Sequence, residues 1–174
     1  MPRPKFEKGP EKFLRRMQIA NYLIDQAHTD WNLALQPWGW LVRERFSLWL
    51  VNRFCDCFLT KDDGSVWMLD VGIGTLEIVA QSKEHFAELA DKDDSGDKTN
   101  DWFLTDLVDQ LVATERHLQP RQCYSFKILP VLGGQYAVDN VYVNSIEKHL
   151  AAAADMHHQL RDLPDGTPFQ LRIT

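Results

Sequence analysis

The sequence predicts an α+β fold: a single domain with an antiparallel sheet of about five or six strands flanked by helices. Strand-like runs follow one another closely in the first half, with turn residues between them. Segments of helical periodicity lie on both sides of those runs, and strands and helices do not alternate as they do in parallel α/β proteins. A length of 174 residues and a hydrophobic content of 44% are enough for a core without disulfides or metal ions.

The N-terminal quarter is predicted to be helical and then irregular. Residues 1–9 read as a flexible basic lead rich in Pro, Gly and Lys, so the domain itself is expected over residues 10–174. Apolar residues at steps of three and four predict an amphipathic helix from Glu11 to His28. The segment from Trp31 to Phe46 is expected to be irregular and packed by its aromatic side chains, because a proline and a glycine interrupt it.

The next segment predicts an antiparallel meander. Its β-rich runs are Leu48–Thr60, Ser65–Asp70 and Leu76–Ala80. Turn signals at residues 62–64 (DDG) and 72–74 (GIG) separate them, and their positions favour hairpins.

The second half of the chain mixes helices with further strands. Helical spacing and serine N-caps predict helices over residues 82–91, 102–116 and 145–163, and β-rich runs predict strands over 123–128, 138–143 and 169–173. Residues 91–101 are a polar break between the first two of these helices.

Composition excludes several classes of function. With 19 basic and 25 acidic side chains the net charge is −6, which argues against a general nucleic-acid binder. No apolar stretch approaches the roughly 20 residues of a membrane span. The N-terminus MPRPKFEKGPEKF lacks an apolar signal core, so a cytoplasmic location is expected.

The cysteines favour packing over chemistry. Cys55, Cys57 and Cys123 are an odd, small number without a secretion signal, which argues against a disulfide framework. Two neighbouring thiols and one distant thiol also fall short of the four ligands typical of structural metal sites. We therefore expect small buried hydrophobic side chains, no metal site and no cofactor.

Residues 91–102 partly match a calcium-binding loop. Acidic, hydroxyl and glycine residues occupy its early positions, but Trp102 stands where the bidentate Glu is required. The match leaves weak calcium binding open and favours a solvated linker.

The sequence contains none of the catalytic motifs considered. The zinc-protease, nucleophile-elbow and phosphate-loop patterns are all missing from the sequence. On the last predicted helix His149, Asp155 and His157 are expected to be surface or capping residues. A binding protein is therefore favoured over an enzyme, although catalytic residues can be far apart in a sequence.

Two stretches together resemble a known group of proteins. The more specific one contains YSFKILPVLGGQY at residues 124–136 and DLPDG at residues 162–166, and the other covers residues 52–79. They resemble a bacterial family of unknown function that is grouped with immunity domains of type VI secretion effectors, and more distantly the SUKH class of toxin-immunity proteins. Members of this family often carry a small residue such as Gly where Cys55 stands.

This resemblance implies a cytoplasmic protein that neutralises a toxin by direct contact and carries no catalytic residues. An acidic surface would be steered toward the basic cleft of a nuclease toxin. The contact residues predicted on this basis are Asp62, Asp63, Asp91, Asp93, Asp94, Asp97 and Asp101.

Two other functions remain open from the sequence. A small-ligand or enzymatic domain would have a pocket lined by Trp31, Trp38 and Trp40, since clustered tryptophans can form a ligand cage. A structural subunit would instead bury an apolar helix face in an oligomer, and the oligomeric state is not predicted.

Overall fold

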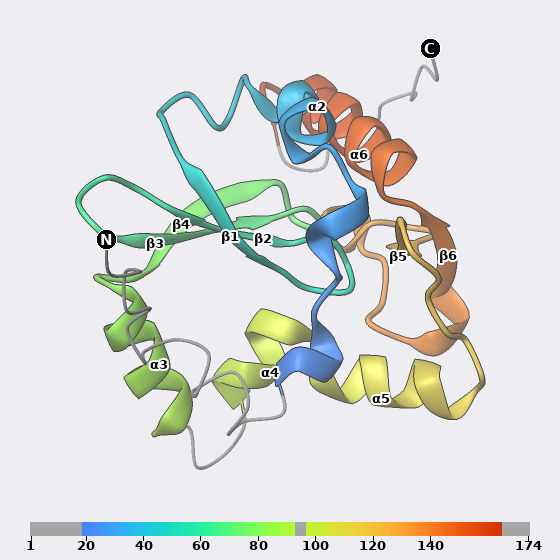
Figure 1. Cartoon of the computed structure of the whole chain (residues 1–174). Helices are drawn as coiled ribbons and strands as arrows, with labels where there is room; N and C mark the ends of the chain where they lie inside the picture. Colours follow the sequence, from blue (N-terminus) through green and yellow to red (C-terminus); the bar gives the residue numbers. More distant parts are fainter. Residues whose placement is uncertain (1–18, 93–96, 165–174) are drawn as a thin grey trace.

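The computed structural model describes residues 19–92 and 97–164, and these form two antiparallel sheets with helices around them (Figure 1). The four-stranded sheet has the order β1-β2-β3-β4, and a separate two-stranded sheet pairs β5 with β6. The strands are β1 (Ser47–Val51), β2 (Cys57–Thr60), β3 (Val66–Asp70), β4 (Thr75–Ala80), β5 (Gln122–Phe126) and β6 (Val141–Ser145). The α+β class is confirmed, and its strands fall into two sheets.

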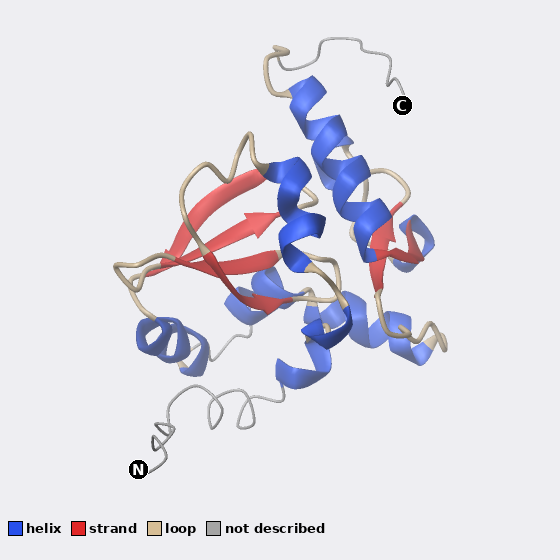
Figure 2. Cartoon of the chain, turned by 45° about the horizontal axis from the view of Figure 1, so that its top comes forward, coloured by secondary structure: helices blue, strands red, loops and turns tan. Residues whose placement is uncertain are grey.

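Helices cover both faces of the four-stranded sheet (Figures 1 and 2). They are α2 (Trp31–Leu35), α3 (Lys83–Asp91), α4 (Asp97–Phe103), α5 (Thr105–Ala113) and α6 (Ile146–Leu160). In Figure 1, α2 and α6 lie above the sheet, whereas α3, α4 and α5 lie below it. Within the described residues, none of these helices has the length and apolar content that crossing a membrane requires.

Alternation along the strands builds a separate core on each face. Leu59 and Leu69 pack in a cluster with Trp38 and Leu150 on the α2 and α6 side. Their strand neighbours face the opposite way, as side chains of period two must. Phe58, for example, packs below the sheet.

The lower core is dominated by aromatic rings. Phe86 of α3 stacks on Trp102 of α4 with ring centroids 4.3 Å apart. Phe58 meets Phe103 at 5.3 Å. A third cluster joins α5 to the two-stranded sheet and includes Leu111 and Tyr124.

The helix predicted from Glu11 to His28 is wrong over its described part. Residues 19–28 form two short 3₁₀ turns, Ile19–Tyr22 and Gln26–His28. The amide of Ile24 donates to the carbonyl of Val51 at 2.9 Å, and Leu23 forms an isolated bridge with Asn52. Pairing with the edge of β1 therefore overrides the helical periodicity.

Polar side chains interrupt two elements that were predicted to be continuous. The run Leu48–Thr60 is a hairpin, because the amide oxygen of Asn52 accepts the backbone N–H groups of Phe54 and Asp56. The helix predicted over residues 102–116 breaks at Leu104, whose φ is 51°. There the side chain of Asn100 accepts the amide of Asp106 at 3.1 Å and caps α5.

Other differences are smaller. The segment predicted as irregular begins with α2, which Asp30 caps by accepting the amide of Leu33. Residues 138–140 form a 3₁₀ turn before β6. The basic lead over residues 1–9 and the strand over residues 169–173 lie outside the described residues.

The loop between β5 and β6 depends on Gly134. A Cβ atom built on Gly134 would lie 1.8 Å from the carbonyl oxygen of Ile128, so no side chain fits. Asn140 closes the same loop, because its side-chain amide donates to the carbonyls of Ile128 and Gln135. Gly133, in contrast, has a φ of 84° but open space around its Cβ position.

We expect Gly134→Ala to lower the free energy of unfolding by about 2–4 kcal/mol, because backbone must move to admit the methyl group. Gly133→Ala is the matched control and should cost only about 1–2 kcal/mol, the penalty of the left-handed conformation. Chemical denaturation of both variants measures the difference. Equal losses would contradict the steric argument.

Candidate functional site

A cleft of about 600 Å³ opens where the ends of β3, α4 and α5 meet the β5–β6 loop. Three of its lining residues carry carboxylates, namely Asp70, Asp101 and Asp106. The full lining consists of Asp70, Asn100, Asp101, Leu104, Asp106, Leu107, Gln110 and Tyr136. We call it the acidic cleft. Among these described lining residues there is no Lys or Arg, so nothing in the wall neutralises the carboxylates.

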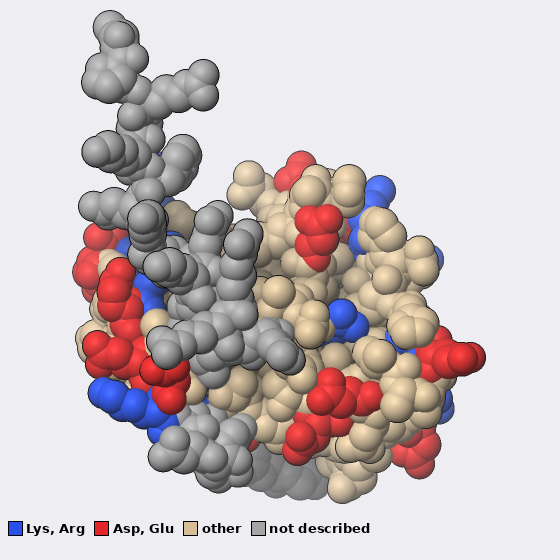
Figure 3. Space-filling model, turned by 60° about the horizontal axis from the view of Figure 1, so that its bottom comes forward, with Lys and Arg blue, Asp and Glu red and all other residues tan. Residues whose placement is uncertain are grey.

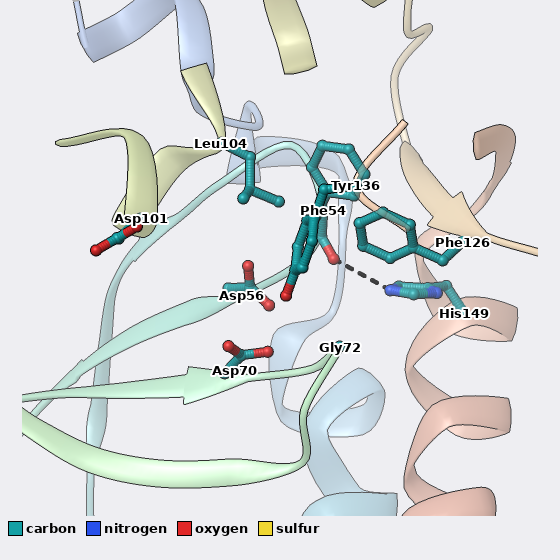
Figure 4. A pocket seen from close by; sticks show the side chains of 9 residues that line it. All are labelled: Phe54, Asp56, Asp70, Gly72, Asp101, Leu104, Phe126, Tyr136 and His149. Carbon is teal, nitrogen blue, oxygen red and sulfur yellow. Dashed lines mark hydrogen bonds between the residues drawn. The ribbon is translucent and has the colours of Figure 1, made fainter. Parts of the chain in front are cut away.

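A smaller chamber of about 30 Å³ continues from the cleft toward the interior (Figure 4). The two share Asp70, Asp101, Leu104 and Tyr136. The chamber adds the side chains of Phe54, Asp56, Phe126 and His149 and the backbone of Gly72. In Figure 4 the rings of Phe54, Phe126 and Tyr136 lie together on one side, with Asp56 and Asp70 below them.

The deepest carboxylate, Asp56, is held by a closed set of hydrogen bonds. It is only 5% exposed. One of its oxygens accepts the side-chain amide of Asn52 at 2.7 Å, and the other accepts the backbone N–H of Val71 at 2.8 Å. The same amide group of Asn52 also donates to the carbonyl of Trp102 at 3.0 Å. This set of contacts connects the β1–β2 turn, the end of β3 and α4.

The outer carboxylates come from three different elements. Asp70 ends β3 and accepts the amide of Ile73 at 2.8 Å, which fixes the β3–β4 turn. Asp101 is exposed on α4, and Asp106 is exposed in the first turn of α5. The turn sets the position of Asp70, and the hydrogen bond from the amide of Asp106 to Asn100 sets that of Asp106, so this part of the acidic wall is built from fixed backbone.

Tyr136 forms the opposite wall. It is 50% exposed, and its ring meets Phe126 of β5 edge to face with centroids 5.3 Å apart. Phe126 in turn stacks on Phe54 at 4.9 Å. The hydrogen bonds of Asn140 fix the loop that carries Tyr136.

Burial and mutual repulsion perturb the ionisable groups at this site. Burial, followed by the charge of Asp70, raises the pKa of Asp56 well above its usual range. Burial also raises the pKa of Asp70. Burial and then the charges of Asp70 and Asp56 raise the pKa of Tyr136 to about 12. A cation entering the cleft would oppose every one of these electrostatic shifts.

His149 and Ser125 form a buried pair behind the chamber. The Nε2 atom of His149 lies 3.1 Å from the carbonyl of Phe54, which can only accept, so this nitrogen carries the proton. Its Nδ1 atom then accepts the hydroxyl of Ser125 at 2.7 Å. Serine and histidine contact each other in this way in hydrolases, but Ser125 is only 1% exposed. Burial lowers the pKa of His149 to about 4, so it is a poor base at neutral pH.

The expectation that His149 and His157 are surface or capping residues is wrong. They are 6% and 4% exposed. His157 contacts the carbonyl of Val71 through Nε2 at 2.9 Å. His149 and His157 therefore each contact one turn of the four-stranded sheet, and tertiary packing explains their offset of eight residues.

The cysteines are all free and buried. Cys55, Cys123 and His149 offer possible ligand atoms within 4.8 Å of one another. Both ring nitrogens of His149 are already hydrogen-bonded, to Ser125 and Phe54. The group as it stands is a packed core and not an open metal site. Cys55 adopts a φ of 68°, a conformation that glycine adopts more readily than any other residue.

The acidic residues predicted to contact a partner separate into several places. Asp101 lines the acidic cleft. Asp62 and Asp63 are exposed in the β2–β3 turn, and Asp91 is exposed at the end of α3. Residues 93 and 94 and the side chain of Asp97 lie outside the described parts. Figure 3 shows acidic side chains scattered over the face below the sheet, with fewer basic ones between them.

The three predicted pocket tryptophans lie away from the acidic cleft, which none of them lines. Trp38 is fully buried, and its indole N–H donates to the carbonyl of Leu150 at 3.1 Å. The indole N–H of Trp31 donates to the carbonyl of Gln26 at 3.2 Å. Trp40 stacks near Trp38 with centroids 6.2 Å apart.

Sequence reasoning missed most of the cleft. Asp56, Asp70, Asp106 and Tyr136 were not singled out as a set, because they are up to 80 residues apart and belong to separate elements. The sequence did offer one signal for the cleft, namely carboxylates that follow strands or begin helices. Side chains at such positions lie at the ends of secondary-structure elements.

Part of the chain matches a known protein family. Residues 80–157 match the family described as T6SS immunity protein Tdi1, C-terminal. The match confirms the resemblance to type VI secretion immunity proteins that the sequence predicted. The matched segment contributes every residue that lines the acidic cleft except Asp70.

Comparison with other proteins adds little. No curated protein matches the chain. Among solved structures, the crystal structure of Atu4351 from Agrobacterium tumefaciens aligns with a TM-score of 0.42 and 22% sequence identity. The alignment covers 83% of this chain and 63% of that one.

We expect Asn52→Ala to lower the free energy of unfolding by at least about 3 kcal/mol, because it leaves several buried polar groups without partners. Asn32→Ala, an exposed change on α2, is the control and should stay within about 0.5 kcal/mol of the parent. Urea unfolding measures both, and a loss below 1 kcal/mol at Asn52 would contradict the role assigned to it.

His149 should make stability depend on pH. Its pKa is lowered to about 4 in the folded chain, so the unfolded chain binds the proton first as the pH falls below about 6.5. This residue should therefore cost up to about 3 kcal/mol of stability between pH 6.5 and 4, and nothing above pH 7.5. The difference in unfolding free energy between the parent and His149→Gln, measured across this range, isolates the effect. A difference that does not change with pH would rule it out.

Proposed function

We propose that this chain, whose residues 80–157 match the family described as T6SS immunity protein Tdi1, C-terminal, neutralises a toxin by binding it directly in the cytoplasm. The observation that carries the proposal is the overlap between the family match and the acidic cleft. The matched segment supplies every residue that lines the acidic cleft except Asp70.

The chemistry of the cleft supports binding over catalysis. Its carboxylates have no described cation among the lining residues, so they favour a basic partner. Long-range attraction between opposite charges accelerates association, which an immunity protein needs when its target is lethal. The overall charge of −6 acts in the same direction.

A small-ligand or enzymatic function is the second candidate. The volume of the acidic cleft falls within the range of ligand pockets. Of the three tryptophans predicted for such a pocket, Trp31 and Trp38 donate their indole N–H groups to backbone carbonyls, and Trp40 stacks near Trp38. The buried Ser125–His149 pair is likewise engaged within the core, because His149 is hydrogen-bonded to both Ser125 and the carbonyl of Phe54.

Affinity purification and rescue of growth test the proposal together. The tagged chain, expressed in its native cells, should retain one stoichiometric protein at low salt and lose much of it at high salt. Expression of that protein alone in a surrogate bacterium should arrest growth, and co-expression of this chain should restore it. A retained protein that is harmless, or whose toxicity persists despite co-expression, would contradict the proposal.

A further inference from the structure

Two exposed apolar side chains lie on segments that adjoin the acidic cleft, although they are not part of its lining. Ile73 lies in the β3–β4 turn and Val131 in the β5–β6 loop, with 36% and 41% of their surfaces exposed. The two segments touch, because the amide of Val131 donates to the carbonyl of Gly72 at 3.3 Å. We call Ile73 and Val131 the apolar rim.

The rim is rigidly joined to the carboxylates. The amide of Ile73 donates to the carboxylate of Asp70, which lines both the cleft and the chamber. Pro130 packs against Gly72, where an added Cβ would lie 3.3 Å from the proline ring. A charged concavity and an exposed apolar edge therefore share one fixed piece of backbone.

The geometry points to a docking surface for a partner-protein segment that places one basic side chain, Arg or Lys, in the acidic cleft between Tyr136 and the carboxylates of Asp70 and Asp101. Apolar residues on either side of that basic residue pack on the rim. This inference deepens the proposed function and rests on it, since it names the part of the toxin that is recognised.

Charge complementarity selects this occupant. The cleft offers carboxylates from β3, α4 and α5 and no described Lys or Arg among its lining residues. Tyr136 presents an aromatic ring beside them, and cations bind favourably over such rings. The volume of about 600 Å³ admits a long side chain and its immediate neighbours.

Behind the cleft, Asp56 positions the walls and offers no contact of its own. Its carboxyl group is buried and already holds Asn52 and Val71. Burial and the charge of Asp70 raise the pKa of Asp56, which disfavours its charged form, so the attraction for a basic group comes from the outer carboxylates of the cleft.

Peptide titration tests the surface without requiring a toxin. The probes are acetylated and amidated pentapeptides, Gly-Leu-Arg-Leu-Gly and its lysine and citrulline counterparts, added to the ¹⁵N-labelled full chain at low salt. Citrulline has the shape of arginine without its charge. We expect the arginine and lysine peptides to shift the amide signals of Asp70, Leu104 and Tyr136, and the citrulline peptide to bind at least about tenfold more weakly.

Charge-matched variants supply the control. Asp101→Asn combined with Asp106→Asn should weaken binding of the arginine peptide about tenfold, whereas Asp62→Asn combined with Asp91→Asn removes the same charge elsewhere and should leave it within twofold. Equal binding of the citrulline peptide, shifts that map outside the cleft, equal effects of the two double variants, or no binding at 10 mM would each overturn the inference.

The toxin recovered by affinity purification extends the test. The cleft variant should lose growth rescue while the Asp62 and Asp91 variant keeps it. If the parent rescues and both variants rescue equally, the inference fails while the proposed function stands. If the parent itself does not rescue, the proposed function fails, and the peptide titration still decides whether the cleft binds basic side chains.

Discussion

The hydrogen bonds between Asn52 and Asp56 are the constraint on which the rest of this structure depends. Asn52 satisfies two backbone amides with its oxygen and divides its own amide group between Asp56 and Trp102. Asp56 uses its second oxygen to hold Val71. One buried contact thereby sets the β1–β2 turn, the end of β3 and the position of α4. A buried network of this kind stabilises only when every member is satisfied, as it is here.

The acidic cleft follows from that constraint. Fixing the end of β3 places Asp70, and fixing α4 places Asp101 beside it. The loop that carries Tyr136 approaches the same place because Gly134 lets its backbone pass close to Ile128. Carboxylates that repel one another are held together by contacts that lie outside the cleft, which leaves their charge available to a partner.

The sequence predicts the local elements of this molecule better than their contacts. Turn signals at residues 62–64 and 72–74, and the serine caps at Ser82 and Ser145, act through neighbouring backbone, so they are visible in the sequence. The failures at residues 19–28 and at Leu104 have a different origin, because pairing with β1 and capping by Asn100 override helical periodicity there. Of the predicted contact residues that the structure describes, only Asp101 lines the cleft, since grouping distant carboxylates requires the tertiary fold.

The cleft also lies along the joint between the two sheets. That joint is crossed by the hydrogen bond from the amide of Tyr124 to the carbonyl of Arg53 and by the bond from Val131 to Gly72. A molecule bound in the cleft would contact both sides of the joint and hold them together. Openings that separate the sheets would then become rarer, and the amide of Tyr124 would exchange its hydrogen with solvent more slowly. Binding in the cleft would in this way be detectable as slower hydrogen exchange at a buried backbone amide.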